Sequence, residues 1–171
     1  MKQTHSTPHR REANRRITGH AQEDHILDPY QRQQKLKDNT VCPECGVVYH
    51  DGRWHWAPRP AGGHEALCSA CRRINDKFPA GIITLHGPFV GHQTEEIVSL
   101  SRHQEGAEKS EHPLNRIISI DKDNGTITIT TTDIHLPRRI GEAVKRAFHG
   151  TLDEHFEEAG YFVRVSWAAS S

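Results

Sequence analysis

Four cysteines carry the strongest chemical signal in this 171-residue chain. They form two Cys-x-x-Cys pairs, Cys42 with Cys45 and Cys68 with Cys71, and 22 residues separate the pairs. Such a pair folds into a tight knuckle that presents two thiolates to one metal ion, and two knuckles complete the tetrahedral sulfur shell of structural Zn²⁺ sites. Because four thiolates leave no coordination position for water, the pattern predicts one structural zinc ion bound by Cys42, Cys45, Cys68 and Cys71.

Three other uses of these cysteines compete with this interpretation. Two disulfides would suit a small secreted domain, but no apolar leader follows Met1, so we expect a cytoplasmic protein with reduced thiols. A thioredoxin-like redox pair would need only one Cys-x-x-Cys beside a βαβ pattern. An iron ion would use the same four ligands. The paired knuckles favour zinc over these alternatives.

The residues around the two pairs predict a small finger over residues 41–79. Residues 47–50 and 53–56 flank Asp51-Gly52, a combination that favours a β-hairpin. Residues 72–78 predict a short helical turn that Pro79 ends. Knuckle, hairpin and a second knuckle opening a helix favour a treble-clef finger, with a zinc ribbon as the alternative. Modules below about 40 residues usually need a metal to fold, so zinc release should unfold this one.

Residues 1–40 predict a disordered basic tail. They hold eight Lys or Arg against five Asp or Glu and few residues able to form a core. The tail is either solvated or folds on a partner, and Asp28-Pro29-Tyr30 is its one candidate anchor. The chain has zero net charge, but the balance runs from +3 in this tail through +1 over residues 41–78 to −4 over residues 79–171. The front of the molecule is therefore the part expected to meet an anionic partner.

Residues 80–168 predict an α+β module. Strands are expected over residues 81–86, 116–120 and 126–132, helices over 92–105 and 136–148, and extended segments over 151–156 and 161–167. Alternating Thr and Ile over residues 126–132 imply a strand with one apolar and one polar face. The order β-α-β-β-α-β, with an extra strand near the end, is that of a ferredoxin-like layer of helices on an antiparallel sheet.

Basic residues recur on the tail, the finger and the second helix of this module. Opposite the apolar face of that helix they form either a solvated surface or a stripe that contacts RNA phosphates. On the finger, aromatic rings beside guanidinium groups suit stacking on unpaired bases, although at least one Trp is expected in the core. The candidate RNA-binding residues are Arg10, Arg11, Arg15, Arg16, Arg53, Trp54, Arg72, Arg73, Arg138, Arg139, Lys145 and Arg146.

Several of these motifs resemble a known family. The Cys-Pro-x-Cys-Gly knuckle, the Gly52-Arg53-Trp54 step, the second knuckle and the run from Thr132 to Gly141 resemble an uncharacterised bacterial family of small four-cysteine zinc proteins, over about residues 40–168. The chain is more distantly similar to the zinc and adjoining α/β part of the archaeal and eukaryotic adaptor that escorts large ribosomal subunits out of the eukaryotic nucleus. It lacks that adaptor's further cysteine pairs and later β-barrel domains. The resemblance therefore implies contact with ribosomes or RNA, and not export.

Together these observations predict a zinc-stabilised, non-enzymatic RNA-binding protein associated with ribosomes or a ribosomal subunit. The alternative is a protein-interaction adaptor that binds a protein through the finger and the acidic C-terminal module. A hydrolase of unknown substrate is a second alternative, although the sequence has no Walker loop, dinucleotide fingerprint, nucleophile elbow or His-Glu-x-x-His motif. No apolar run approaches the ~18 residues of a membrane span, so no membrane partner is expected.

Overall fold

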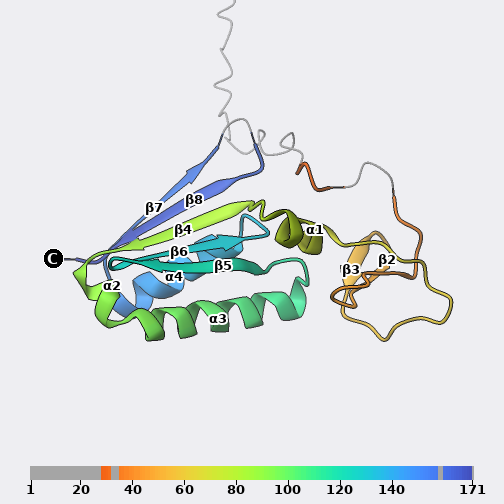
Figure 1. The fold of residues 1–171 in the computed structure, drawn as a ribbon, viewed down its shortest axis with the longest axis horizontal. Helices are drawn as coiled ribbons and strands as arrows, with labels where there is room; N and C mark the ends of the chain where they lie inside the picture. Colours follow the sequence, from red (N-terminus) through yellow and green to blue (C-terminus); the bar gives the residue numbers. More distant parts are fainter. Residues whose placement is uncertain (1–27, 32–34, 158–159, 171) are drawn as a thin grey trace, which may run out of the picture.

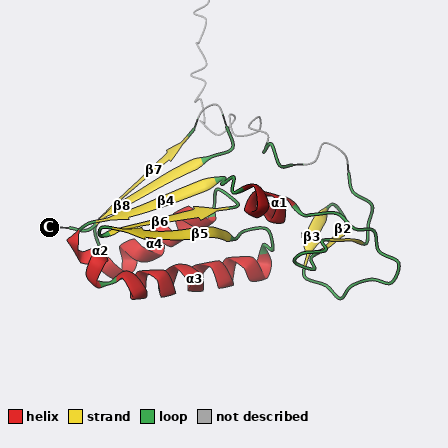
Figure 2. Cartoon of the chain, viewed as in Figure 1, coloured by secondary structure: helices red, strands yellow, loops and turns green. Residues whose placement is uncertain are grey.

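A computed structural model describes residues 28–31, 35–157 and 160–170, which form a small finger and a larger five-stranded sheet with helices (Figures 1 and 2). The four tail arginines, Arg10, Arg11, Arg15 and Arg16, lie outside these residues. None of the described helices is long and apolar enough to cross a membrane. The finger contains β1 (Thr40–Val41), β2 (Val48–His50), β3 (Arg53–His55) and α1 (Ser69–Asp76). The sheet module contains β4 (Gly81–His86), α2 (Pro88–His92), α3 (Thr94–Glu111), β5 (Ile117–Asp123), β6 (Thr126–Thr131), α4 (Leu136–Phe148), β7 (Thr151–Phe156) and β8 (Val163–Ala168).

The hairpin predicted within the finger is confirmed. Strands β2 and β3 pair antiparallel with Tyr49 opposite Trp54. The turn between them holds Asp51 at φ 48° and Gly52 at φ 81°, the left-handed conformations that a two-residue hairpin loop requires. Strand β1 adds a third strand to this sheet by pairing with β2. Residue 40 therefore belongs to the finger, one position before the predicted boundary.

The five strands of the larger sheet lie in the order β5-β6-β4-β8-β7. The strands and helices follow one another as predicted, except that two helices occupy the first helical region, and the prediction of an antiparallel sheet is wrong at one pair, because β8 pairs parallel with β4. The extra strand explains the difference. Strand β7 forms a hairpin with β8 at the sheet edge, so the chain reverses once more before it reaches the place beside β4.

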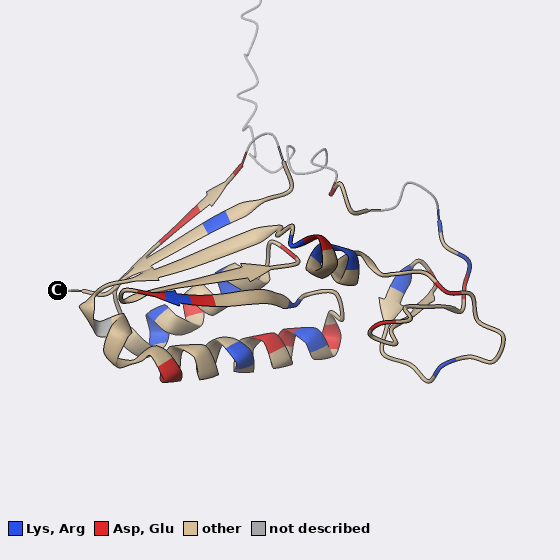
Figure 3. Ribbon diagram, in the orientation of Figure 1, with Lys and Arg blue, Asp and Glu red and all other residues tan. Residues whose placement is uncertain are grey.

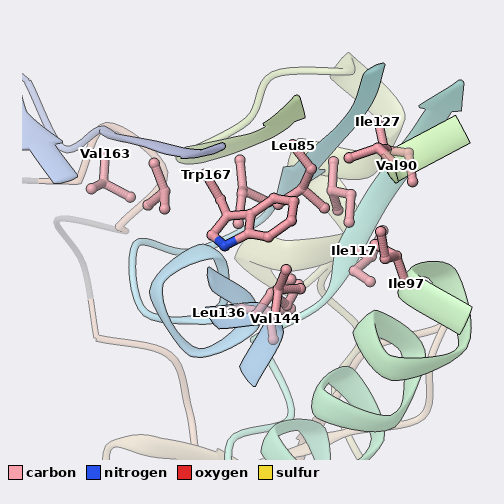
Figure 4. Packing of buried hydrophobic residues seen from close by; sticks show 13 residues of the cluster. Leu85, Val90, Ile97, Ile117, Ile127, Leu136, Val144, Val163 and Trp167 are labelled. Carbon is pink, nitrogen blue, oxygen red and sulfur yellow. The ribbon is translucent and has the colours of Figure 1, made fainter. Parts of the chain in front are cut away.

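One face of this sheet carries the main hydrophobic core. Residues that pair directly across strands point to the same face, and Ile83, opposite both Ile129 and Val165, is buried with them. Thr128 and Thr130, on the other face of β6, are only half-buried, which confirms the predicted two-faced strand. Helices α3 and α4 supply the opposite wall of the core, and Trp167 lies between strand residues and α4 residues such as Leu136 (Figure 4).

The first helical region differs from the prediction of one helix over residues 92–105. Two helices occupy it, and α3 continues through Gly106 to Glu111. Hydrogen bonds of two α3 carboxylates explain the added turns. Glu105 Oε1 accepts from the backbone N–H of Ile117 at 2.7 Å. The carboxylate of Glu108 is buried and accepts from Arg139 Nε at 2.6 Å and Asn115 Nδ2 at 3.0 Å. These bonds offset the ~1 kcal/mol that an internal Gly costs a helix.

Helix α4 has the predicted bounds, 136–148. Asp133 lies two residues before its N-cap, His135, and one of its carboxylate oxygens accepts from the N–H groups of His135 at 2.7 Å and Leu136 at 3.0 Å. Burial raises the pKa of this carboxyl, although the two N–H groups oppose the shift. These two hydrogen bonds fix the start of the helix that covers the sheet.

Candidate metal centre

The four cysteines converge at one end of the finger. Cys42 follows β1, Cys68 is the N-cap of α1 and Cys71 lies in the first turn of that helix. The four sulfur atoms all lie within 4.8 Å of one another, and all but that of Cys45 belong to buried residues. The sequence therefore identified a set of ligands that the fold brings together around one point.

Backbone hydrogen bonds build the first knuckle and bring the second beside it. Cys42 N donates to Val47 O at 2.9 Å, and Gly46 N donates to Cys42 O at 2.9 Å. The long loop between the pairs closes on Val41, whose N–H donates to His64 O at 2.7 Å and whose carbonyl accepts from Ala66 N at 3.1 Å. These two hydrogen bonds to Val41 place the second knuckle beside the first.

The spacing of the sulfur atoms fits a tetrahedral metal ion. Zn–S bonds of about 2.3 Å at tetrahedral angles place neighbouring sulfur atoms about 3.8 Å apart. The sulfurs of Cys45 and Cys68 are 3.8 Å apart, and all four cysteines are free thiols. A disulfide would need about 2.05 Å between two sulfurs. The geometry and the all-thiolate donor set thus match a closed four-ligand metal site.

The pKa values of three thiols, Cys42, Cys68 and Cys71, are shifted in different directions. Burial opposes ionisation of Cys42, but the backbone N–H groups of Cys68, Cys45 and Glu44 outweigh it and lower the pKa of Cys42 to about 7. Burial and the charges of neighbouring cysteines raise the pKa of both Cys68 and Cys71. Four thiolates therefore repel one another at this point, and a bound cation relieves the repulsion.

The apolar cluster around the centre is small. Its buried members are Val47, Ala70 and three of the cysteines, and Trp54, Leu67 and Leu114 pack against it. It is separate from the core of the larger sheet. A cluster of this size does not bury enough apolar surface to hold a finger together, which is why metal binding should contribute directly to its folding.

Arg116 reaches the cysteines from the larger module, just before β5. Its Nη2 donates to Cys45 Sγ at 3.1 Å and its Nη1 to Cys71 Sγ at 3.4 Å. Burial would lower the pKa of Arg116, but the hydrogen bond and charge of Cys45 raise it overall. Sequence analysis missed this residue. A single arginine that lies 45 and 71 positions from its partners gives no local signal.

Two of the candidate RNA-binding residues lie on α1 and contact the segment 28–31. Arg73 is only 1% exposed, pairs with Asp28 and stacks over the ring of Tyr30. Its guanidinium is therefore a structural group, and we remove it from the RNA-contact set. Arg72 is half-buried and donates to Tyr30 O. Tyr30 also stacks on Phe78, so the candidate anchor in the tail does contact the finger.

The basic residues of α4 divide into two kinds. Arg138 pairs with Glu154 and Arg139 with Glu108, so acidic groups already offset their charges. Lys145 and Arg146 are exposed toward the end of the helix. Acidic and basic residues also mix along α3 (Figure 3). The basic stripe predicted on α4 is thus a surface of mixed charge.

The hairpin contributes one exposed and one packed candidate. Arg53 is exposed, whereas Trp54 is half-buried, contacts the edge of Tyr49 and packs on the metal cluster. Trp56, which follows β3, donates from its indole N–H to Lys109 O at 2.8 Å at the end of α3. Trp54 therefore packs within the finger, whereas Trp56 joins the finger to α3.

Comparisons with known proteins do not add a relationship to these observations. No protein-family model, no curated protein and no solved structure matches this chain. The resemblance to the small four-cysteine zinc proteins and to the ribosomal export adaptor therefore stays a prediction.

Proposed function

We propose that this chain is a non-catalytic RNA-binding protein whose finger is stabilised by one structural zinc ion and which associates with ribosomes or a ribosomal subunit. The metal part is supported by the convergence and spacing of Cys42, Cys45, Cys68 and Cys71. The ribosomal part is supported by the resemblance described above. Knuckle, hairpin and a second knuckle at the start of α1 support a treble-clef finger, and the element order from β4 onward supports a ferredoxin-like module extended by β7.

A pocket beside the metal centre is the observation that carries the RNA proposal. It has a volume of about 420 Å³ and lies between segment 28–31, the hairpin and α1. Its lining combines aromatic rings, aliphatic side chains and two cations, and it includes Tyr30, Tyr49, Trp54, Leu36, Leu67, Leu114, Lys35 and Arg72. Lys35 and Gly52 lie exposed at its rim. Proteins bind unpaired nucleotides with this combination, because rings and aliphatic groups contact the base and cations contact the phosphate.

The size and charge of the pocket suit a nucleotide of a single strand. Its volume falls within the range of about 300 to 1,000 Å³ usual for small-ligand pockets. Arg72 is held in place by its hydrogen bond to Tyr30 O. Lys35 is exposed, so its side chain can adjust to the phosphate backbone of a bound RNA. We therefore assign a base-contacting role to the walls and a phosphate-contacting role to Lys35 and Arg72.

Lys35→Glu should weaken the binding of a short single-stranded RNA about tenfold, equivalent to about 1.4 kcal/mol. The change reverses an exposed charge at the pocket rim and leaves the buried side chains in place. The slope of log K against log salt should also fall by about 0.7 for each phosphate that the variant no longer binds. Fluorescence anisotropy over a salt series measures both quantities.

Lys77→Glu is the matched control for this experiment. It makes the same charge reversal at an exposed position beside α1 that does not line the pocket. Equal weakening by both substitutions would show that only overall charge matters and would remove the pocket assignment. An RNA affinity that changes neither with salt concentration nor with Lys35→Glu would contradict the RNA-binding proposal as a whole.

Sedimentation of a cell lysate through a density gradient at low salt tests the ribosomal part. We expect the protein to travel with a ribosomal subunit and to move to the top of the gradient as salt rises, because phosphate contacts are screened and released. Protein that stays at the top even at low salt would contradict ribosome association while leaving RNA binding itself open to the anisotropy test.

A protein-interaction adaptor remains the second candidate, because one surface favours it. Phe78, the large apolar residue on this surface, is 54% exposed. A pocket of about 390 Å³ near Phe78 is lined by Pro29, Pro79, Tyr161 and Phe162, with Glu157 and Arg164 also among its residues. Aromatic residues are enriched in protein interfaces. Binding through this surface should survive high salt, which distinguishes it from binding to RNA phosphates.

A further inference from the structure

Arg116 lies at the boundary between the finger and the larger module, and each nitrogen atom of its guanidinium has a hydrogen-bond acceptor. The residue is 6% exposed. Its Nε donates to Pro113 O at 2.7 Å, while Nη1 and Nη2 donate to the sulfurs of Cys71 and Cys45 at 3.4 and 3.1 Å. The ring of Trp56 lies 5.8 Å from the guanidinium carbon. All three nitrogen atoms of a buried cation are therefore directed by specific partners.

Arg116 and the backbone divide the four sulfur atoms between them. Cys42 Sγ accepts from Cys68 N at 3.4 Å, and Cys68 Sγ accepts from Cys71 N at 3.4 Å. Cys45 and Cys71 are the two that accept from Arg116. Each sulfur thus accepts at least one N–H group. A divalent ion with four thiolates carries a net charge of −2, and Arg116 supplies a positive charge that backbone amides do not carry.

The larger module holds Arg116 in place. Its backbone N–H donates to Thr132 Oγ1 at 2.9 Å, and its carbonyl accepts from Thr132 N at 2.9 Å. Thr132 follows β6, so two strands of the sheet fix the position of this arginine. Leu114 packs on the metal cluster from the same loop. The sheet therefore presents a cation at a fixed place against the finger.

We propose that Arg116 is the counter-cation of the metal centre and that, through its bonds to Cys45 and Cys71, it couples metal binding to docking of the finger on the sheet. The proposal relies on the metal assigned above and is independent of RNA binding. Zinc binding displaces the protons of the four thiols and leaves a centre of net charge −2. Arg116 offsets part of this charge and stabilises the thiolates that bind the metal. Because such coupling is reciprocal, metal binding should strengthen docking of the finger on the sheet, and docking should raise the affinity for the metal.

Arg116→Gln should lower zinc affinity about 10-fold to 100-fold in competition with a chromophoric chelator, the range usual for removing an outer partner of a metal ligand. Arg116→Lys should fall between the wild type and Arg116→Gln, because an ammonium keeps the charge and loses the planar fork that reaches two sulfurs. Arg53→Gln removes an exposed cation from the finger itself and serves as the control that should leave zinc affinity unchanged.

Alkylation of individual cysteines separates this role from general loosening of the fold. In zinc-loaded Arg116→Gln protein, mass spectrometry after iodoacetamide treatment should show faster modification of Cys45, the half-buried ligand that loses its donor. Cys42 and Cys68 keep their backbone donors and should react as in the wild type. Thr132→Val, which removes a backbone anchor of Arg116, provides a comparison for local destabilisation. Faster modification of all four cysteines alike, or zinc affinity equal to that of the wild type, would overturn the proposal.

Discussion

Cys68→Ser should abolish zinc binding and unfold the finger, while the five-stranded sheet stays folded. Cys68 is both one of the four clustered cysteines and the N-cap of α1, and it is fully buried. Structural zinc contributes about 10–16 kcal/mol of apparent binding free energy to modules of this kind, and that energy is folding free energy. The sheet has a separate core, so it does not depend on this contribution. Elemental analysis should find one zinc per wild-type chain and none in the variant.

Tryptophan fluorescence can report on the finger and on the sheet module separately. Trp54 and Trp56 belong to the finger, whereas Trp167 is fully buried in the core of the sheet. In Cys68→Ser protein we expect part of the fluorescence to shift toward that of exposed tryptophan, with the helical circular dichroism largely retained. Ser69→Ala, at the next position, is the control that should keep the metal. Loss of the whole helical signal in Cys68→Ser protein would show that the two modules form one cooperative unit.

Local patterns were sufficient to predict several elements of the fold. The paired knuckles identified ligands that do meet, because each Cys-x-x-Cys constrains its own backbone wherever the rest of the chain goes. Asp51-Gly52 marked a hairpin turn, because few other residues accept its left-handed conformations. Alternation of Thr and Ile identified the buried face of β6. Each of these signals lies within a few residues of the feature that it predicts.

The features that were missed depend on contacts between distant residues. The direction of β8 relative to β4 follows from the hairpin that β8 forms with the edge strand β7. The last turns of α3 depend on the burial of Glu108 against Arg139. Arg116 resembles any other arginine until the sheet places it beside the thiolates. Arg73 shows the reverse case, since only the structure reveals that it is buried against Asp28.

Trp167→Ala should unfold the larger module and should also weaken metal binding. Trp167 is fully buried, and its indole N–H donates to His149 O at 2.6 Å. The chain passes so close that a Cβ on Gly150, at φ 87°, would lie 2.8 Å from the indole nitrogen. Removing a buried aromatic side chain costs about 3–5 kcal/mol, a large fraction of the ~5–15 kcal/mol that stabilises a typical domain. Urea denaturation followed by circular dichroism measures this loss.

The expected effect on the metal reverses the outcome of Cys68→Ser. The finger should be able to unfold while the sheet stays folded. Unfolding of the sheet, in contrast, should lower the zinc affinity of the finger, because Arg116 and Leu114 reach the metal cluster from the sheet module. Trp167→Phe keeps a buried ring and loses mainly the bond to His149, so it should cost less and retain zinc affinity. If Trp167→Ala protein lost its sheet and still held zinc as tightly as the wild type, the finger would be independent and the role assigned to Arg116 would be wrong.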